Sequence, residues 1–170
     1  MRKKRTLRLL GRALACVLAS AVFWGWIFTF LTDTDPERKI VIYADMREFR
    51  WRELSLALEE DTPEEIRLVQ VRPFTYALMN PAALEQADLY VMPESHAEEY
   101  ADWILSAPEG ESAGLLLYDA ETGDGAAREY LNYGECPGEN WVLYFGARSP
   151  HAGGADSAAG EIAERLLRLP

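Results

Sequence analysis

From residue 39 to the C-terminus, apolar runs of five to nine residues alternate with amphipathic stretches. The runs are rich in β-branched and aromatic residues, a composition that favours buried strands. Five strands are therefore expected, at residues 39–44, 66–74, 87–92, 114–118 and 141–145. The short length of each run, bounded by polar or turn-forming residues, separates these segments from buried helices.

Apolar residues at helical spacing predict helices between the strands. Two pairs of residues have the spacing of capping boxes, in which two side chains bond to free backbone N–H groups. The pairs are Asp45 with Glu48 and Ser95 with Glu98. The expected helices cover residues 45–61, a broken stretch at 76–86 interrupted at Pro81, residues 95–104, a short piece at 126–131, and a last helix that begins at Asp156 or Ser157.

Strands that alternate with helices in this way are typical of an α/β fold. Because strand–helix–strand crossovers are right-handed, successive helices cover the sheet from its two sides. The sequence therefore predicts a three-layer domain at residues 39–170, with a mostly parallel five-stranded sheet and helices on both faces.

A different pattern precedes this domain. Residues 13–31 form a run of 19 residues without a charged side chain, which as a helix would be about 28 Å long. That length suits one crossing of a bilayer, so a transmembrane signal-anchor helix is expected. Residues 1–12 contain six basic residues, and by the positive-inside rule they would be cytoplasmic. Residues 32–38 would be a linker, and the rest a domain outside a bacterial cell membrane that the chain crosses once.

Three other interpretations of residues 13–31 stay open. A cleaved secretory signal could end near Ala19-Ser20-Ala21, although about ten mostly apolar residues follow. Ala13-Leu14-Ala15-Cys16 faintly resembles a lipoprotein signal, but the apolar run follows the cysteine instead of preceding it. A buried soluble helix is disfavoured by the basic residues before it. The anchor agrees best with both the charge and the length of the run.

Charge separates the two parts of the chain. Six of the 17 basic residues lie before residue 13 and all 28 acidic residues lie after residue 32, so residues 32–170 carry a formal charge of −17. A domain this acidic repels nucleic acid, which argues against DNA or RNA as a partner. The two cysteines, Cys16 and Cys136, would lie in different parts and would not pair. No Cys/His spacing indicates a metal site, and no motif indicates a cofactor.

Ligands of open α/β sheets bind beyond the carboxyl ends of the strands. The residues expected at that edge, and proposed as ligand-binding, are Asp45, Phe74, Tyr76, Glu94, Ser95, Asp119 and Glu121. Helix capping is a competing role for Asp45 and Ser95. The carboxylates of residues 119–125 do not follow the register of an EF-hand calcium loop, so a plain turn is expected there. No catalytic residue and no metal ligand is assigned.

The order of elements resembles the first lobe of type 2 periplasmic solute-binding proteins. The resemblance covers residues 39–169, and its segments are KIVIYA at 39–44, IRLVQV at 66–71, ADLYV at 87–91 and ENWVLYFG at 139–146. The chain also looks like a group of small membrane-anchored bacterial proteins with this layout. The resemblance implies ligand binding without catalysis. Solute-binding proteins close two lobes on a ligand, and this chain has residues for one, so a second chain would have to complete the clamp.

The expected function is therefore a membrane-anchored binding domain that serves as a sensor, a scaffold or a transporter accessory. Its expected partners are a small-molecule ligand, another envelope protein or a second copy of the chain. Two alternatives remain. One is a hydrolase of the cell envelope that uses Asp119, Glu121 or His151, which requires these side chains to share one cleft. The other is a purely structural partner of another membrane protein, which requires an exposed apolar patch.

Overall fold

A computed structural model describes residues 11, 14–27, 34–60, 62, 64–79, 81–105, 114–151 and 157–170. The chain divides into two compact units, Met1–Thr34 and Asp35–Pro170, and each is described by itself. The second unit contains the sheet and all of the side chains that are discussed below as candidate functional residues.

In the first unit, residues 14–27 are helical. Within the described residues, no helix is long and apolar enough to cross a membrane. This finding contradicts the prediction of a single-pass signal anchor at residues 13–31. Residues 13 and 28–31 of the predicted span lie outside the described residues.

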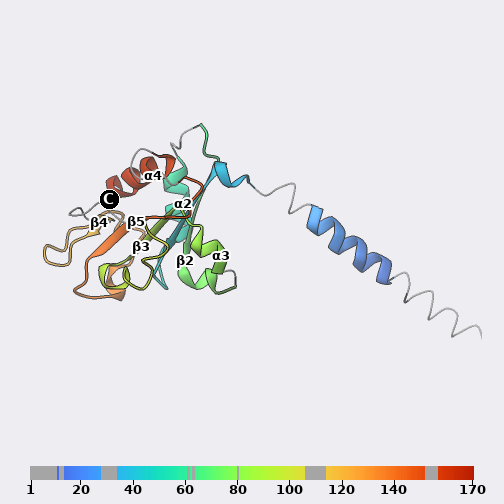
Figure 1. Ribbon diagram of the computed structural model, residues 1–170, viewed down its shortest axis with the longest axis horizontal. Helices are drawn as coiled ribbons and strands as arrows, with labels where there is room; N and C mark the ends of the chain where they lie inside the picture. The colour runs from blue at the N-terminus through green and yellow to red at the C-terminus, as the bar shows by residue number, and fades with distance from the viewer. Residues whose placement is uncertain are drawn as a thin grey trace, which may run out of the picture. The chain divides into compact units, whose positions relative to one another are not determined.

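The second unit contains a five-stranded sheet whose strands lie close to the predicted positions (Figure 1). The strands are β1 (Lys39–Ala44), β2 (Leu68–Pro73), β3 (Leu89–Pro93), β4 (Gly114–Tyr118) and β5 (Trp141–Phe145). Three of them, β1, β4 and β5, begin and end where the sequence predicted. The apolar composition of each run identified the strands correctly because these runs fill the two cores of the domain.

The prediction of a mostly parallel sheet is wrong, because the sheet is mixed. Its strand order is β2-β1-β3-β5-β4. Strand β1 is parallel to β2 and β3, whereas β5 is antiparallel to both of its neighbours, β3 and β4. Parallel neighbours need a crossover that is usually helical, and residues 119–140 between β4 and β5 contain turns and a 3-10 helix but no α-helix. Strand β5 therefore enters between β3 and β4 in the reverse direction.

Helices cover both faces of the sheet, as predicted for a three-layer domain (Figure 1). The α-helices of this unit are α2 (Trp51–Glu59), α3 (Pro81–Glu85) and α4 (Ala158–Arg168), and the 3-10 helices are η1 (Pro36–Arg38), η2 (Phe74–Met79), η3 (Glu94–His96) and η4 (Tyr133–Glu135). Helices α2 and α4 cover one face, where Leu54, Leu58 and Ile162 pack on the sheet. The shorter elements α3, η2 and residues 94–104 cover the other face.

The two faces of the sheet differ in composition. The face under α2 and α4 is mainly aliphatic, whereas the face under α3 is aromatic. On the aromatic face, Phe74 contacts the rings of Tyr43, Tyr90 and Tyr100 edge to face, with centroids 5.3–6.4 Å apart. Edge-to-face contact is a favoured geometry of aromatic pairs and adds to the burial of the rings. These aromatic residues therefore form a second core.

Asp88 lies at the amino end of β3, and it is the buried polar residue of the described core, with 2% of its surface exposed. Its carboxylate accepts hydrogen bonds from the backbone N–H of Val41 at 2.6 Å, from the Ser149 hydroxyl, and from Nδ1 of His151 at 2.9 Å. A buried carboxylate needs such partners because burial removes its hydration. Asp88 thus ties the segment after β5 to the start of β1.

Two predicted helices are shorter than their sequence signals suggest. Helix α2 begins at Trp51, its N-cap residue Arg50 makes no side-chain cap bond, and residues 45–50 form bends instead of the first helical turn. Residues 95–104 form the end of η3 followed by turns instead of a helix. Neither predicted capping box forms, so the side chains of Asp45 and Ser95 have other partners. The bends after β1 and the turns after β3 line the cavity described next.

Candidate ligand-binding crevice

The chain changes direction across the sheet at strand β1. It leaves β1 toward β2 on one side and later adds β3 on the other side, with all three strands parallel. At such a switch point the connections at the carboxyl ends of the two central strands diverge, which leaves a crevice between them. The residues that follow β1 and β3 are 45–50 and 94–96, so a ligand site is expected where these two segments face each other.

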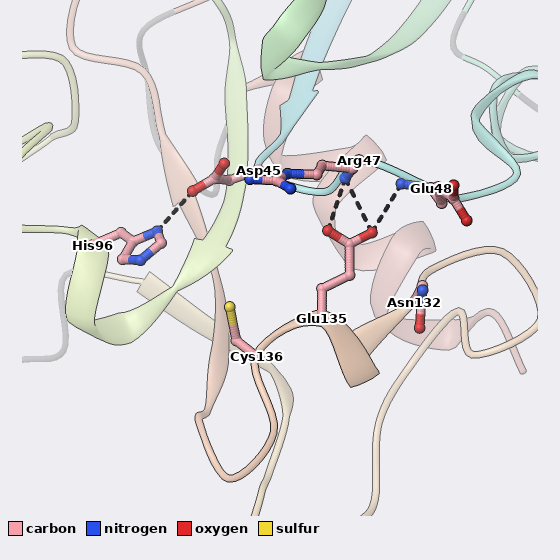
Figure 2. A pocket seen from close by; sticks show the side chains of 7 residues that line it. All are labelled: Asp45, Arg47, Glu48, His96, Asn132, Glu135 and Cys136. Atoms are coloured by element: carbon pink, nitrogen blue, oxygen red, sulfur yellow. Dashed lines mark hydrogen bonds and ion pairs between the residues drawn. The ribbon is translucent and has the colours of Figure 1, made fainter.

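A cavity of about 470 Å³ opens at this point (Figure 2). Its lining residues are Asp45, Arg47, Glu48, His96, Asn132, Glu135 and Cys136. Three of them follow β1, one belongs to η3 after β3, and the others come from residues 132–136 in and around η4. The volume lies within the range of small-molecule sites, which is roughly 300–1,000 Å³. The crevice is thus built from three segments that are far apart in the sequence.

Asp45 and His96 join the two sides of the crevice. The carboxylate of Asp45 and Nδ1 of His96 are 2.7 Å apart, and both side chains are partly exposed (Figure 2). The backbone N–H of Asp45 donates to the carbonyl of Val91 at 2.8 Å, and the next residue, Met46, is buried at 2% exposure. These contacts hold the segment after β1 against β3. The Asp45 carboxylate therefore orients the imidazole of His96 and does not cap a helix.

Glu135 closes the crevice from the side of η4. Its carboxylate accepts the backbone N–H of Arg47 at 3.0 and 2.9 Å and the backbone N–H of Glu48 at 2.8 Å (Figure 2). Two consecutive backbone N–H groups thus converge on one carboxylate group. Consecutive N–H groups that point into the same space form a concave site for anions.

Cys136 contributes a thiol to the lining of the crevice. Its pKa is raised by burial, and the nearby carboxylates of Glu139, Asp45 and Glu135 raise it further. The thiol is the unreactive form of cysteine, and a raised pKa keeps the side chain in that form near neutral pH. Cys136 therefore lacks the electropositive surroundings that activate a nucleophilic cysteine.

Asp45 and His96 form an Asp–His pair in the crevice. An Asp–His pair such as Asp45–His96 can orient a general base, which is one part of a nucleophilic catalyst. The other part is an activated nucleophile, and the Cys136 thiol has no hydrogen bond to His96 in the described part of the chain. Across the described ranges, no three His, Cys, Asp or Glu side chains are grouped so that they could hold a metal ion. The crevice offers hydrogen-bond donors, carboxylates and an imidazole around an open volume.

Asn140 organises the polar groups further along the same sheet edge. Its side-chain amide donates to the carboxylate of Glu94 at 3.2 Å, and its side-chain oxygen accepts the backbone N–H of Ala120 at 3.0 Å. Ser95 donates its hydroxyl to the carboxylate of Glu139. These bonds fix the turn after β4 beside the start of η3. Ser95 thus belongs to this network and does not cap a helix.

The polar residues that were predicted to bind a ligand occupy three places in the fold. Asp45 lines the crevice, and Glu94 and Ser95 lie at the same sheet edge in the Asn140 network. Asp119 and Glu121 are in the turn after β4, where the backbone N–H of Glu121 donates to Asp119. A second hollow of about 440 Å³ near this turn includes Asp119.

The predicted aromatic residues lie away from the crevice lining. Phe74 packs inside the aromatic core on the far face of the sheet. Tyr76 is 55% exposed, and its ring contacts the ring of Trp51 at a centroid distance of 6.0 Å. The guanidinium group of Arg72 lies 5.6 Å from the centre of the Tyr76 ring. Of these predicted residues, Asp45 lines the crevice, whereas Phe74 and Tyr76 lie outside its lining.

The residues named for a hydrolase lie at opposite edges of the sheet. His151 contacts Asp88 at the amino end of β3, and its Nε2 lies 3.1 Å from the backbone oxygen of Glu37, just before β1. Asp119 and Glu121 follow the carboxyl end of β4, which runs in the same direction as β3. The structure thus does not bring His151 and these carboxylates into one cleft.

Sequence reasoning missed six of the seven lining residues. Arg47 and Glu48 follow the predicted strand at 39–44, but the predicted helix cap assigned that segment to a helix. His96 falls within the helix expected at residues 95–104, and no local pattern distinguishes it there. Glu135 and Cys136 lie 88 or more residues beyond Arg47, and no local pattern indicates that they return to β1.

Fold and site together define a mixed α/β domain with a polar crevice at its topological switch point. Comparisons with protein-family models, with curated proteins and with solved structures found no match to the chain.

Proposed function

We propose that residues 35–170 form a non-catalytic ligand-binding domain, similar in layout to one lobe of a solute-binding protein, that binds a small molecule in the crevice between β1 and β3. The observation that carries the proposal is the position of the crevice. It has a volume of about 470 Å³, it contains polar groups from three segments, and it lies where open α/β sheets bind their ligands. A sensor or an accessory subunit of a transporter would use such a domain.

The raised pKa of Cys136 keeps its thiol in the unreactive form, which supports a binding role for the crevice. Polar side chains converge on a cavity here, and placed polar groups are what orient a ligand and give a pocket its specificity. Because this domain corresponds to one lobe, the opposite side of a bound ligand would remain open. A second copy of the chain or another protein would then cover it, and ligand binding would promote that association.

A thermal-shift screen of the full chain against carboxylic acids, amino acids, amines, sugars and nucleotides tests the proposal. A ligand at about 100 times its Kd should stabilise the folded protein by about 2.7 kcal/mol, which is readily measured as a rise in Tm. Arg47→Ala removes an exposed basic side chain of the crevice, and Arg128→Ala removes an equally basic, exposed side chain outside it. The first variant should lose at least part of the shift, and the second should retain it.

Two results would count against the proposal. One is that none of these compound classes raises the Tm of the wild-type chain. The other is that a compound binds but loses no affinity in Arg47→Ala compared with Arg128→Ala, which would place its site outside the crevice. Chromatography with light scattering, with and without the ligand, then shows whether binding promotes association of two chains.

A further inference from the structure

The carboxylate of Glu135 accepts two consecutive backbone N–H groups at the crevice. The backbone N–H groups of Arg47 and Glu48 are hydrogen-bond donors of the crevice, and three N···O distances of 2.8–3.0 Å connect them to this single group. We propose that the ligand of the crevice carries a carboxylate group, that this group binds to the two N–H groups, and that it displaces Glu135 when it binds. This inference rests on the proposed ligand-binding function.

The geometry of the two donors matches a planar carboxylate. Each oxygen of Glu135 lies within 3.0 Å of the N–H of Arg47, and one of them also receives the N–H of Glu48. Backbone N–H groups in bends are fixed in direction, so they keep this arrangement after Glu135 leaves. An incoming carboxylate would therefore replace the existing hydrogen bonds one for one, and neither backbone N–H group would lose its partner.

Glu135 can leave this position without disturbing the core. Its side chain extends from the 3-10 helix η4, its hydrogen bonds lie at the surface, and it does not belong to either hydrophobic cluster. Surface interactions of a charged side chain contribute little net stability because water solvates the released group. The neighbouring residue of η4, Tyr133, is buried and holds the segment in place. The displaced carboxylate would thus move into solvent while η4 stays on the core.

The charges around the crevice determine which anion is accepted. Residues 32–170 carry a formal charge of −17, so an anion is repelled at long range and local donors have to overcome this repulsion. Arg47 supplies a positive side chain at the crevice, whereas the charge of Asp45 faces the imidazole of His96. The two backbone N–H groups and the Arg47 side chain together suit an anion with a single negative charge. A multiply charged phosphate would meet the additional carboxylate of Glu48, so a monocarboxylate is the better fit.

Glu135→Ala provides a direct test, because truncation at Cβ removes one methylene and one carboxylate, which together have the size of acetate. Acetate is titrated into the full chain at 0.15 M salt, where the long-range repulsion is largely screened. The binding is followed through the backbone amide signals of Arg47 and Glu48 in ¹H–¹⁵N NMR spectra. We expect acetate to bind Glu135→Ala at least about tenfold more tightly than the wild type, because it no longer competes with an attached carboxylate.

Three further variants make the test specific. Glu139→Ala removes a carboxylate of the adjacent loop that receives the Ser95 hydroxyl and no backbone N–H, so acetate should not bind more tightly there. Glu135→Gln keeps the shape of the side chain and should still obstruct the site. Glu135→Asp shortens the side chain and should give an intermediate affinity. The Asp variant also replaces the Ala variant in the titration if Glu135→Ala does not fold.

The inference is overturned if acetate affects the Arg47 and Glu48 signals equally in the wild type, Glu135→Ala and Glu139→Ala. It is also overturned if phosphate binds Glu135→Ala and acetate does not. A neutral or cationic compound that binds the wild-type crevice, with an affinity unchanged by Glu135→Ala, would leave the proposed ligand-binding function intact and refute only the displacement of Glu135. Tighter acetate binding to Glu135→Ala alone supports the inference.

Discussion

Replacement of Asp88 tests the most demanding polar contact of the fold. The side chain is 2% exposed, and it accepts hydrogen bonds from the backbone N–H of Val41, from the Ser149 hydroxyl and from the His151 ring. Asp88→Ala removes the acceptor from all three donors and leaves the N–H of Val41, in the middle of the sheet, without a partner. Asp88→Asn keeps the volume and one acceptor oxygen but removes the charge.

The magnitudes follow from the number of contacts that each variant loses. A buried hydrogen bond to a charged group contributes about 1.5–3 kcal/mol, and Asp88→Ala loses one from the backbone N–H of Val41 and two from side chains, so the free energy of unfolding should fall by about 3–5 kcal/mol. In Asp88→Asn the remaining oxygen can still accept from Val41, and the Ser149 hydroxyl can rotate to accept from the new amide. The free energy of unfolding of Asp88→Asn should therefore fall by about 1–2 kcal/mol, which is the difference between charged and neutral hydrogen bonds.

The assay is urea unfolding followed by circular dichroism, with the free energy obtained by linear extrapolation. His151→Ala is the matched control, because it removes one partly exposed donor and leaves the carboxylate with two; it should cost about 1 kcal/mol. The reasoning fails if Asp88→Ala lies within about 1 kcal/mol of the wild type, or if it is no less stable than Asp88→Asn.

Two further predictions concern other polar contacts. The Ser55 hydroxyl accepts the outward-facing backbone N–H of Val71 at 2.9 Å. Ser55→Ala removes this acceptor and should lower the free energy of unfolding in urea by about 1 kcal/mol. An unchanged value would show that this contact does not stabilise edge strand β2. Burial raises the pKa of Tyr90 and Tyr133 in the folded state above the ordinary value of 10.0. The folded protein therefore holds these protons more tightly than the unfolded chain, and the free energy of unfolding falls as the pH rises above 10. For each residue, the fall is at most about 1.4 kcal/mol per pH unit. Tyr133→Phe should therefore show a shallower decline between pH 10 and 11 in urea unfolding, and an unchanged slope would contradict this assignment.

The sequence predicted the strands well, because their signal is local. Residues 39–44, 114–118 and 141–145 contain nearly continuous apolar runs that are short and bounded by turns, and each forms a strand with those limits. The last helix was predicted to begin at Asp156 or Ser157, and α4 begins at Ala158 with Ser157 as its N-cap, which accepts the backbone N–H of Gly160. Composition is a property of a few neighbouring residues, so it can be recognised without knowledge of the fold, whereas the capping boxes predicted at Asp45 and Ser95 did not form.

Strand direction was predicted wrongly, because an alternation of strands and helical patterns contains no information about which strands become neighbours. The sequence of elements led to the expectation of a mostly parallel sheet, whereas the sheet is mixed. The turns at residues 126–131 resemble a helical segment in sequence, yet they leave β5 free to return between β3 and β4. The glycine at position 146 reflects this packing, because a Cβ atom there would overlap the carbonyl of Ala87. Such a close approach is invisible in the sequence.

The candidate site shows the same division between local and long-range information. By itself the sequence determined that strands end at Ala44 and near Met92, and therefore that Asp45 and residues 94–96 lie at a sheet edge where ligands bind. Only the tertiary structure decided that Asp45 bonds to His96 instead of capping a helix. It also decided that Glu135 accepts the backbone N–H of Arg47, which lies 88 residues away in the sequence. Strand ends follow from local composition, whereas contacts between distant side chains depend on how the whole chain packs.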